Sequence, residues 1–488
     1  MRMFLPASLA LALAVPSAAR ADASAELGAL RQEIESMRAA YEARLQSLEQ
    51  RLKAAEAAAA AQTPPPGAAA AASTVPASTA PATSWGAAPV APSEAVSAAP
   101  PTPPPTAPAG GGGIAAFNPA LSLILSGLYT RSSKDPENYA ITGFPRGEDA
   151  EIGPGTRGFS LAESELALSA SIDPWLRGAL NIALHPDDSV SVEEGYIQTT
   201  SLGAGFALKA GRFFSNVGYL NPQHSHTWDF VDNPLAYQAI LGTQYGDDGV
   251  QLTWLAPTEQ YLELGAELGR GRGFPGGDDS RNGAGMVALT AHTGDDVGAS
   301  HSWRAGLSML RTRSDDQALE GLQGPDGSHA PSAFRGHTRV WVADAVWKWA
   351  PGGNATRTSF KLQGEYLHST RSGDLTFDPE GLDSRDDYRA VQSGWYVQGV
   401  YQFLPGWRLG LRTERLDAGS PDYGLNASNY ADSGYEPHKN SLMLDYNPSE
   451  FSRLRLQFAR DSAREDANDH QLFLQYQTSL GAHGAHGY

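Results

Sequence analysis

The sequence predicts an all-β transmembrane barrel of about 16 antiparallel strands, preceded by an α-helical coiled coil and a Pro/Ala-rich linker. From residue 114 onward, apolar and polar residues alternate in segments of roughly ten, separated by turn residues. The connections are alternately long and short, as in a barrel whose hairpins have tight turns on one side of a membrane. Beyond the N-terminus, no stretch approaches the roughly 20 apolar residues of a membrane helix.

The composition excludes several classes of function. The 488 residues include no cysteine, so the chain forms no disulfide bonds. The net charge of −18 lies almost entirely beyond residue 113, and it argues against nucleic acid as a partner because phosphates require a basic surface. The catalytic motifs of hydrolases, zinc proteases and nucleotide-binding enzymes are absent from the sequence. We therefore expect neither an enzyme nor a cofactor.

The first 113 residues divide into three parts. Residues 1–21 have the basic, apolar and small-residue order of a secretory signal peptide, with a short membrane anchor as the alternative. Residues 22–57 carry apolar residues three and four positions apart, which predicts a self-associating coiled coil or, alternatively, a single amphipathic helix lying on another surface. Residues 58–113 consist almost entirely of Ala, Pro, Ser, Thr and Gly and form an extended spacer. Residues 114–488 form the barrel.

Sixteen barrel strands are predicted, and two observations set their orientation. Six tryptophans lie close to short connections, where amphipathic rings mark a membrane interface: Trp175, Trp254, Trp303, Trp347, Trp349 and Trp407. In the last strand, polar residues such as Gln471 and Gln475 alternate with apolar residues such as Leu474 and Tyr476, so one face suits water and the other lipid. The strands begin near residues 121, 159, 176, 190, 206, 249, 261, 285, 300, 337, 359, 390, 407, 440, 451 and 469.

The polar faces of these strands place two groups of charges in the barrel lumen. The pore-lining basic candidates are Arg408, Arg412, Arg453 and Arg455, and the pore-lining acidic candidates are Glu163, Glu165, Glu263 and Glu267. Because the two groups come from different strands, they predict an acidic and a basic arc with a field across the lumen. The alternative is that each charge is only a solvated part of the wall.

The connection from Phe214 to Asp248 is the longest, and a structureless loop of this length inside a domain indicates a function. We expect it to fold into the lumen and to narrow it. Its polar candidates for the constriction are Asn221, His224, His226, Asp229 and Asp232, with aromatic residues between them as anchors. The pair His224 and His226 has some metal-ligand potential, but two histidines without a third ligand favour pore lining or hydrogen bonding, so no metal is predicted. His483 and His486 are weaker candidates still.

The chain resembles outer-membrane porins of the phosphate-selective porin O/P type and related trimeric porins with an N-terminal periplasmic coiled coil. Three features carry the resemblance: the coiled coil from Leu27 to Ala55, the strand Leu208 to Phe214 before the long loop, and the count of sixteen strands. In general sixteen-strand porins the loop after the fifth strand folds inside, and here that is the longest loop. The resemblance implies a homotrimer. A phosphate channel of that family has a ladder of Arg and Lys, whereas this lumen is mixed and its loops are acidic.

These observations predict a porin of the bacterial outer membrane, in contact with its lipid and with a periplasmic N-terminal extension. It would allow passive, selective diffusion of small polar or charged solutes, constricted by the loop 214–248. The first alternative is a structural tether in which the coiled coil contacts the cell wall. The second is an energy-coupled receptor, which would need a plug domain that the Ala/Pro linker does not supply.

Overall fold

The computed structural model describes residues 119–148, 150–277, 282–432 and 434–481, all within one compact unit. The predictions for the signal peptide, the coiled coil, the linker, His483 and His486 lie outside these residues. The described strands are β1 (Ala120–Ser132), β2 (Arg146–Gly147), β3 (Gly158–Leu161), β4 (Ser164–Ser171), β5 (Leu176–Leu184), β6 (Val190–Thr199), β7 (Phe206–Phe214), β8 (Gly246–Leu255), β9 (Tyr261–Gly269), β10 (Met286–Val297), β11 (His301–Glu320), β12 (Ser332–Trp349), β13 (Ser359–Phe377), β14 (Ser384–Leu404), β15 (Trp407–Asp417), β16 (His438–Ser449), β17 (Ser452–Arg464) and β18 (Ala467–Gly481).

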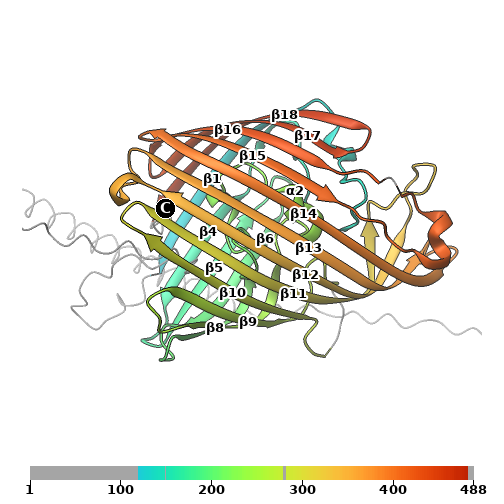
Figure 1. Cartoon of the computed structure of the whole chain (residues 1–488), viewed down its shortest axis with the longest axis horizontal. Coiled ribbons are helices and arrows are strands. Elements are labelled where there is room, and N and C mark those ends of the chain that lie inside the picture. Colours follow the sequence, from blue (N-terminus) through green and yellow to red (C-terminus); the bar gives the residue numbers. More distant parts are fainter. Residues whose placement is uncertain (1–118, 149, 278–281, 433, 482–488) are drawn as a thin grey trace, which may run out of the picture. The chain divides into compact units, whose positions relative to one another are not determined.

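The strands form one closed antiparallel barrel (Figure 1). From β4 to β18 each strand pairs with the next one in sequence, and β1 pairs with β18 from Ser122↔Gly481 to Ser132↔Gln471, which closes the wall. β3 and β4 both pair with β1 and are successive parts of one wall strand, whereas β2 is a two-residue strand paired with the end of β11. Counted in this way, the wall has sixteen strands, and the predicted barrel class and strand count are confirmed.

The alternation that predicts the strands also sorts the two faces of the wall. In β18, Gln471, Gln475 and Gln477 are buried inside, while Leu474 and Tyr476 are each 48% exposed on the outside. An apolar outer face and a polar inner face are what a barrel surrounded by lipid requires. Among the described helices, none is long and apolar enough to cross a membrane.

Four strands are longer than the sequence indicates. β11, β12, β13 and β14 contain 20, 18, 19 and 21 residues, about twice the length that crosses a membrane. Residues 314–336 and 369–388, which precede the predicted strand starts near 337 and 390 and are expected to be loops, are therefore mostly strand. Beyond the membrane both faces of a strand meet water or loops, so the polar residues there show no apolar alternation although their backbones still pair. An aromatic cluster with Phe334 and Tyr388 packs inside this extension.

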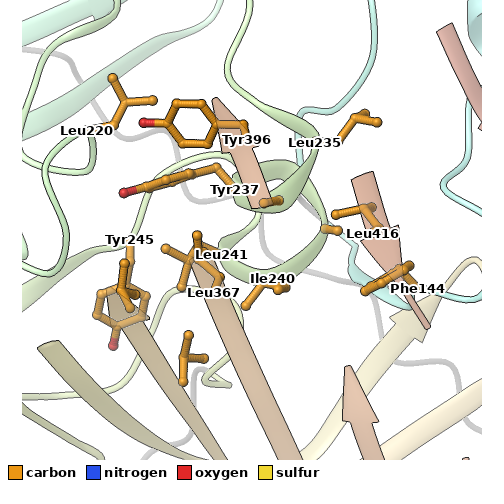
Figure 2. Packing of buried hydrophobic residues seen from close by; sticks show 14 of the residues in the cluster. Phe144, Leu220, Leu235, Tyr237, Ile240, Leu241, Tyr245, Leu367, Tyr396 and Leu416 are labelled. Carbon is orange, nitrogen blue, oxygen red and sulfur yellow. The ribbon is translucent and has the colours of Figure 1, made fainter. Parts of the chain in front are cut away.

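The interior of the barrel contains a hydrophobic core, which the sequence analysis did not predict. Its centre is the short helix α2 (Leu235–Leu241), all of whose residues are buried. Figure 2 shows α2 among side chains of the wall, including Leu367 of β13, Tyr396 of β14 and Leu416 of β15. Phe144 from the connection after β1 packs into the same cluster. The lumen is therefore occupied by apolar packing on the side of β10 to β15.

Candidate functional site

The candidate site is the lumenal loop, residues 215–245, which connects β7 to β8. It is slightly shorter than the predicted segment 214–248, because Phe214 pairs with Gly246 and the strand ladder continues from there. The loop contains a short 3-10 turn, Ser225–Thr227, followed by α2. Its side chains contact the wall from β4 to β17, as the following bonds show, so the loop lies inside the barrel.

The first half of the loop presents two histidines to the predicted acidic candidates. Nδ1 of His224 lies 3.1 Å from a carboxylate oxygen of Glu165 and 3.1 Å from one of Glu193, while its Nε2 lies 2.9 Å from Glu194. His226 Nδ1 lies 2.7 Å from the other oxygen of Glu165. Ser225, between the histidines, donates a hydrogen bond to Glu163. The two histidines of the loop therefore face the acidic side of the wall.

The second half of the loop presents two aspartates to basic side chains. Asp229 forms ion pairs with Lys361 and, at 3.2 Å, with Arg408. Asp232 lies 2.8 Å from Arg412 and 2.6 Å from Lys439, and it also accepts a hydrogen bond from Gln457 at 2.8 Å. The loop is thus charge-complementary to the wall on both sides.

Arg453 and Arg455 support this half of the loop through its backbone. Arg453 donates to the carbonyl oxygen of His226 at 2.8 Å, and Arg455 donates to that of Trp228 at 2.9 Å. The basic arc also contains its own acids, because Arg408 and Arg455 both pair with Asp445. Three arginines of the predicted arc, Arg408, Arg412 and Arg455, are therefore paired with carboxylates of the wall or the loop.

Burial and the facing charges of the wall set the ionisation of the loop's side chains. Burial raises the pKa of Asp229 and Asp232, but the facing cations outweigh burial, so both carboxyls have a pKa well below the ordinary value. Burial also lowers the pKa of His224, but the carboxylates of Glu165, Glu193 and Glu194 outweigh it and hold the pKa well above the ordinary value. The loop remains charged across the neutral range, so its attachment to the wall does not depend on small changes of pH.

Three predicted residues hold the base of the loop. Asn221 is fully buried, donates to the carbonyl oxygens of Ser215 and Tyr245 at 2.8 and 2.9 Å, and accepts from the Tyr245 amide at 2.8 Å. Glu267 accepts from the hydroxyl of Ser215 at 2.6 Å, and Glu263 accepts from the side-chain amide of Asn216 at 3.2 Å. These side chains connect the two stems of the loop to each other and to β9.

Glu365 of β13 is a further anchor of the loop. Its carboxylate accepts hydrogen bonds from the backbone amides of Tyr219 and Leu220, each at 3.0 Å, and from the hydroxyl groups of Tyr237 and Tyr396 at 2.8 and 2.5 Å. The backbone can approach so closely because Gly218, with a φ of +71°, has no side chain at this point. A methyl group on Gly218 would overlap both the carboxylate and Tyr237.

Sequence reasoning missed two charged residues that form ion pairs with the loop. Lys439, which forms an ion pair with Asp232, lies one residue before the predicted start of its strand. Glu193 precedes Glu194, and regular alternation places it on the lipid face. A β-bulge places it in the lumen instead, because Asn181 pairs with Glu194 whereas Ile182 pairs with Val192. Two consecutive acids within a membrane strand are the available signal for such an irregularity.

Comparison with known proteins gives one relative that shows a family and several solved structures of lower similarity. No protein-family model matches the chain. The solved structures include the outer membrane channel DcaP of Acinetobacter baumannii, with 14% identity and a TM-score of 0.44 over 76% of this chain and 100% of that one. They also include an anion-selective porin from Comamonas acidovorans, with 12% identity and a TM-score of 0.45 over 75% of this chain and 100% of that one.

The relative is an uncharacterized protein of Aquifex aeolicus (strain VF5). It is 32% identical over 396 residues, which cover 76% of this chain and 80% of the relative. Identity of this extent shows common membership of one family. The chain therefore belongs to the same protein family as this uncharacterized protein of Aquifex aeolicus.

Proposed function

We propose that the chain is an outer-membrane porin through which small polar or charged solutes diffuse passively, and that the lumenal loop narrows the path. The observation that carries the proposal is a closed sixteen-strand wall with ion pairs to an inserted loop on both of its sides. Water-filled barrels of this size have room for a solute path beside such a loop. Many of the wall residues that face outward are large and apolar, which suits contact with outer-membrane lipid.

The finer expectations belong to the same proposal. The resemblance to the porin O/P type implies a homotrimer and the selective diffusion of small anions or polar solutes, and the periplasmic coiled coil of residues 22–57 would extend toward the cell wall. The loop carries two aspartates and two histidines into a wall with acids and bases, so we expect selection among solutes by charge as well as by size.

Single-channel recording in planar bilayers tests the proposal. The purified full chain should give steady open channels at constant voltage. A salt gradient then yields a reversal potential that reports the sign of the preferred ion. A bilayer that stays silent while the protein is inserted would refute the porin and favour the tether, because an inert barrel with a coiled coil serves that role.

The constriction is tested by loosening the loop rather than by deleting it, since deletion of residues 215–245 would also remove much of the interior core. Asp229→Asn combined with Asp232→Asn removes both of the loop's negative charges and keeps the side-chain volume. We expect larger or more variable conductance than in the parent. Asp316→Asn is the matched control, because Asp316 forms ion pairs with Arg335 and Arg385 far along the long strands. Equal conductance in all three proteins, together with faster proteolysis of the loop in the double variant, would show that the loop does not narrow the path.

A further inference from the structure

The contact between the loop and the acidic side of the wall contains a convergent set of ligand atoms. Nδ1 of His224 and one carboxylate oxygen each from Glu165 and Glu193 all lie within 4.8 Å of one another. The two nitrogen to oxygen distances are 3.1 Å. A tetrahedral metal with bonds of about 2.1 Å separates neighbouring ligand atoms by about 3.4 Å. The nitrogen and each of the two oxygens therefore need to move apart by only a few tenths of an ångström to accept a metal.

The wall departs from regular pairing twice in order to bring these carboxylates inside. In β6 the bulge turns Glu193 into the lumen beside Glu194, although Val192 before them faces outward. In the strand formed by β3 and β4, the pairs Gly127↔Leu161 and Ile124↔Glu165 enclose two residues on β1 but three on the other side. This extra residue reverses the faces, so Leu161 is exposed outward and Glu165 is buried inside.

Both irregularities therefore bring a carboxylate to the imidazole of His224. A regular strand would place Glu193 in lipid, and Glu165 would share the outward face of Leu161. β-bulges gather near functional sites because they redirect a side chain at the expense of a ladder hydrogen bond. Two bulges that direct acids toward one histidine are more than a solvated acidic surface requires.

The residues around the three atoms orient them as the neighbours of metal ligands do. A histidine that binds a metal through one ring nitrogen donates its other N–H to a carboxylate or carbonyl. Here Nε2 of His224 lies 2.9 Å from Glu194, and Asn181 fixes the same carboxylate at 3.2 Å. His226 Nδ1 holds the second oxygen of Glu165 at 2.7 Å. Both the ring and a carboxylate ligand are thus oriented by further residues.

The cluster is rich in buried carboxylates. Those of Glu165, Glu193 and Glu194 surround the imidazole of His224, and Lys209 faces Glu194 from the neighbouring strand. The side chain of Glu165 is only 2% exposed and that of Glu193 only 10%. Buried carboxylates are stabilised by the cations that face them, and a bound metal would be a further one.

We propose that Glu165, Glu193 and His224 bind a divalent transition-metal cation of the zinc class, and that the metal ties the lumenal loop to β4 and β6. Imidazole nitrogen with carboxylate oxygen suits zinc and its neighbours, whereas calcium and magnesium prefer oxygen ligands alone. The metal takes the place of the proton on Nδ1, which is released to solvent, and water completes the coordination. The proposal does not depend on conduction by the barrel.

Metal binding by the folded full chain tests the proposal. Because His483 and His486 can bind metal themselves, all proteins carry His483→Ala and His486→Ala. Titration calorimetry with Zn²⁺ at neutral pH should give one site per chain, and Co²⁺ should give the visible absorption bands of a four-coordinate site. His224→Ala and Glu193→Gln should each weaken binding by more than about 100-fold. Glu194→Gln should weaken it by about 10-fold, because Glu194 only orients the ring of His224.

The controls separate ligation from general effects. His185→Ala removes a histidine of the β5–β6 turn that bonds to Ser191, and it should leave Zn²⁺ binding unchanged. Glu193→Gln keeps the size of the side chain, so it remains informative if His224→Ala fails to fold. Three results would each overturn the proposal: no stoichiometric Zn²⁺ binding by the parent, parental affinity in Glu193→Gln, or displacement of Zn²⁺ by an equal concentration of Ca²⁺.

Discussion

Replacing Asp232 by asparagine tests whether ion pairs hold the lumenal loop. The carboxylate of Asp232 is 8% exposed and faces Arg412 and Lys439, each of which is 1% exposed. Asn keeps the shape but removes the charge, and it leaves two buried cations with one partner fewer. Arg412 retains Glu414 at 2.7 Å, and Lys439 retains Asp461 at 3.1 Å.

The size of the effect follows from these remaining partners. Removing one member of a buried pair costs about 3 to 5 kcal/mol when the other charge is left alone. Because both cations keep a second carboxylate, we expect the lower limit, about 3 kcal/mol. This corresponds to a decrease of roughly 100-fold in the population of the docked loop, at about 1.4 kcal/mol per factor of ten.

Two measurements report the effect of Asp232→Asn. Limited proteolysis should cut the loop faster in the variant, and single-channel current should fluctuate more if the barrel conducts. The exposed Asp316→Asn serves as the control and should change neither, because surface ion pairs contribute little. If Asp232→Asn is cut and conducts like the parent, the ion pairs do not hold the loop, and the interior core alone must do so.

Three further predictions concern the loop and the wall. Gly218→Ala should destabilise the folded barrel by about 2 kcal/mol or more, because the methyl group would lie 2.7 Å from the Tyr237 hydroxyl. Denaturant unfolding in detergent measures this loss. Gly203 has a similar φ but open space around it, so Gly203→Ala should cost less. Leu411→Arg should cost about 2 to 4 kcal/mol or prevent insertion into lipid vesicles, because Leu411 is 62% exposed on the outer face, whereas Leu411→Met should insert normally. The pKa of Asp232 is lowered in the folded chain, so the stability that this carboxylate contributes is present above the ordinary pKa of 3.8. That stability is lost as the pH falls through the lowered pKa. The difference in unfolding free energy between the parent and Asp232→Asn should therefore stay constant from pH 7 to about 5 and shrink in stronger acid.

The wall could be predicted from the sequence because lipid and water impose a period of two on every spanning strand. Where that constraint ends, the prediction ends too, as in the outer parts of β11 to β14, whose polar sequence resembles a loop. The candidate site divides in the same way. His224 and Asp232 stand out as charged residues in a long loop, but Glu193 faces the lumen only because of a bulge, which alternation cannot reveal.

The interior core could not be predicted because its members are separated in the sequence. Leu235 and Tyr237 of α2 look like ordinary anchors in a loop, and Leu367 and Leu416 look like isolated apolar residues on polar faces. They form a cluster only once the barrel is closed and the loop is inside. Glu365 belongs to the same group, since its four donors come from the loop and from β14.

The position of the core decides where a solute path can run. Inward residues of β10 to β14, such as Ser308, Val340 and Leu367, are almost completely buried against the loop, whereas Ser169 of β4 remains exposed. If the barrel conducts, the path should therefore follow the side of β4 to β7, past His224. Because the chain has no cysteine, this expectation can be tested with Ser169→Cys and the matched Ser308→Cys. A charged thiol reagent should change the current through Ser169→Cys and leave Ser308→Cys unaffected, and the reverse result would place the path against the core.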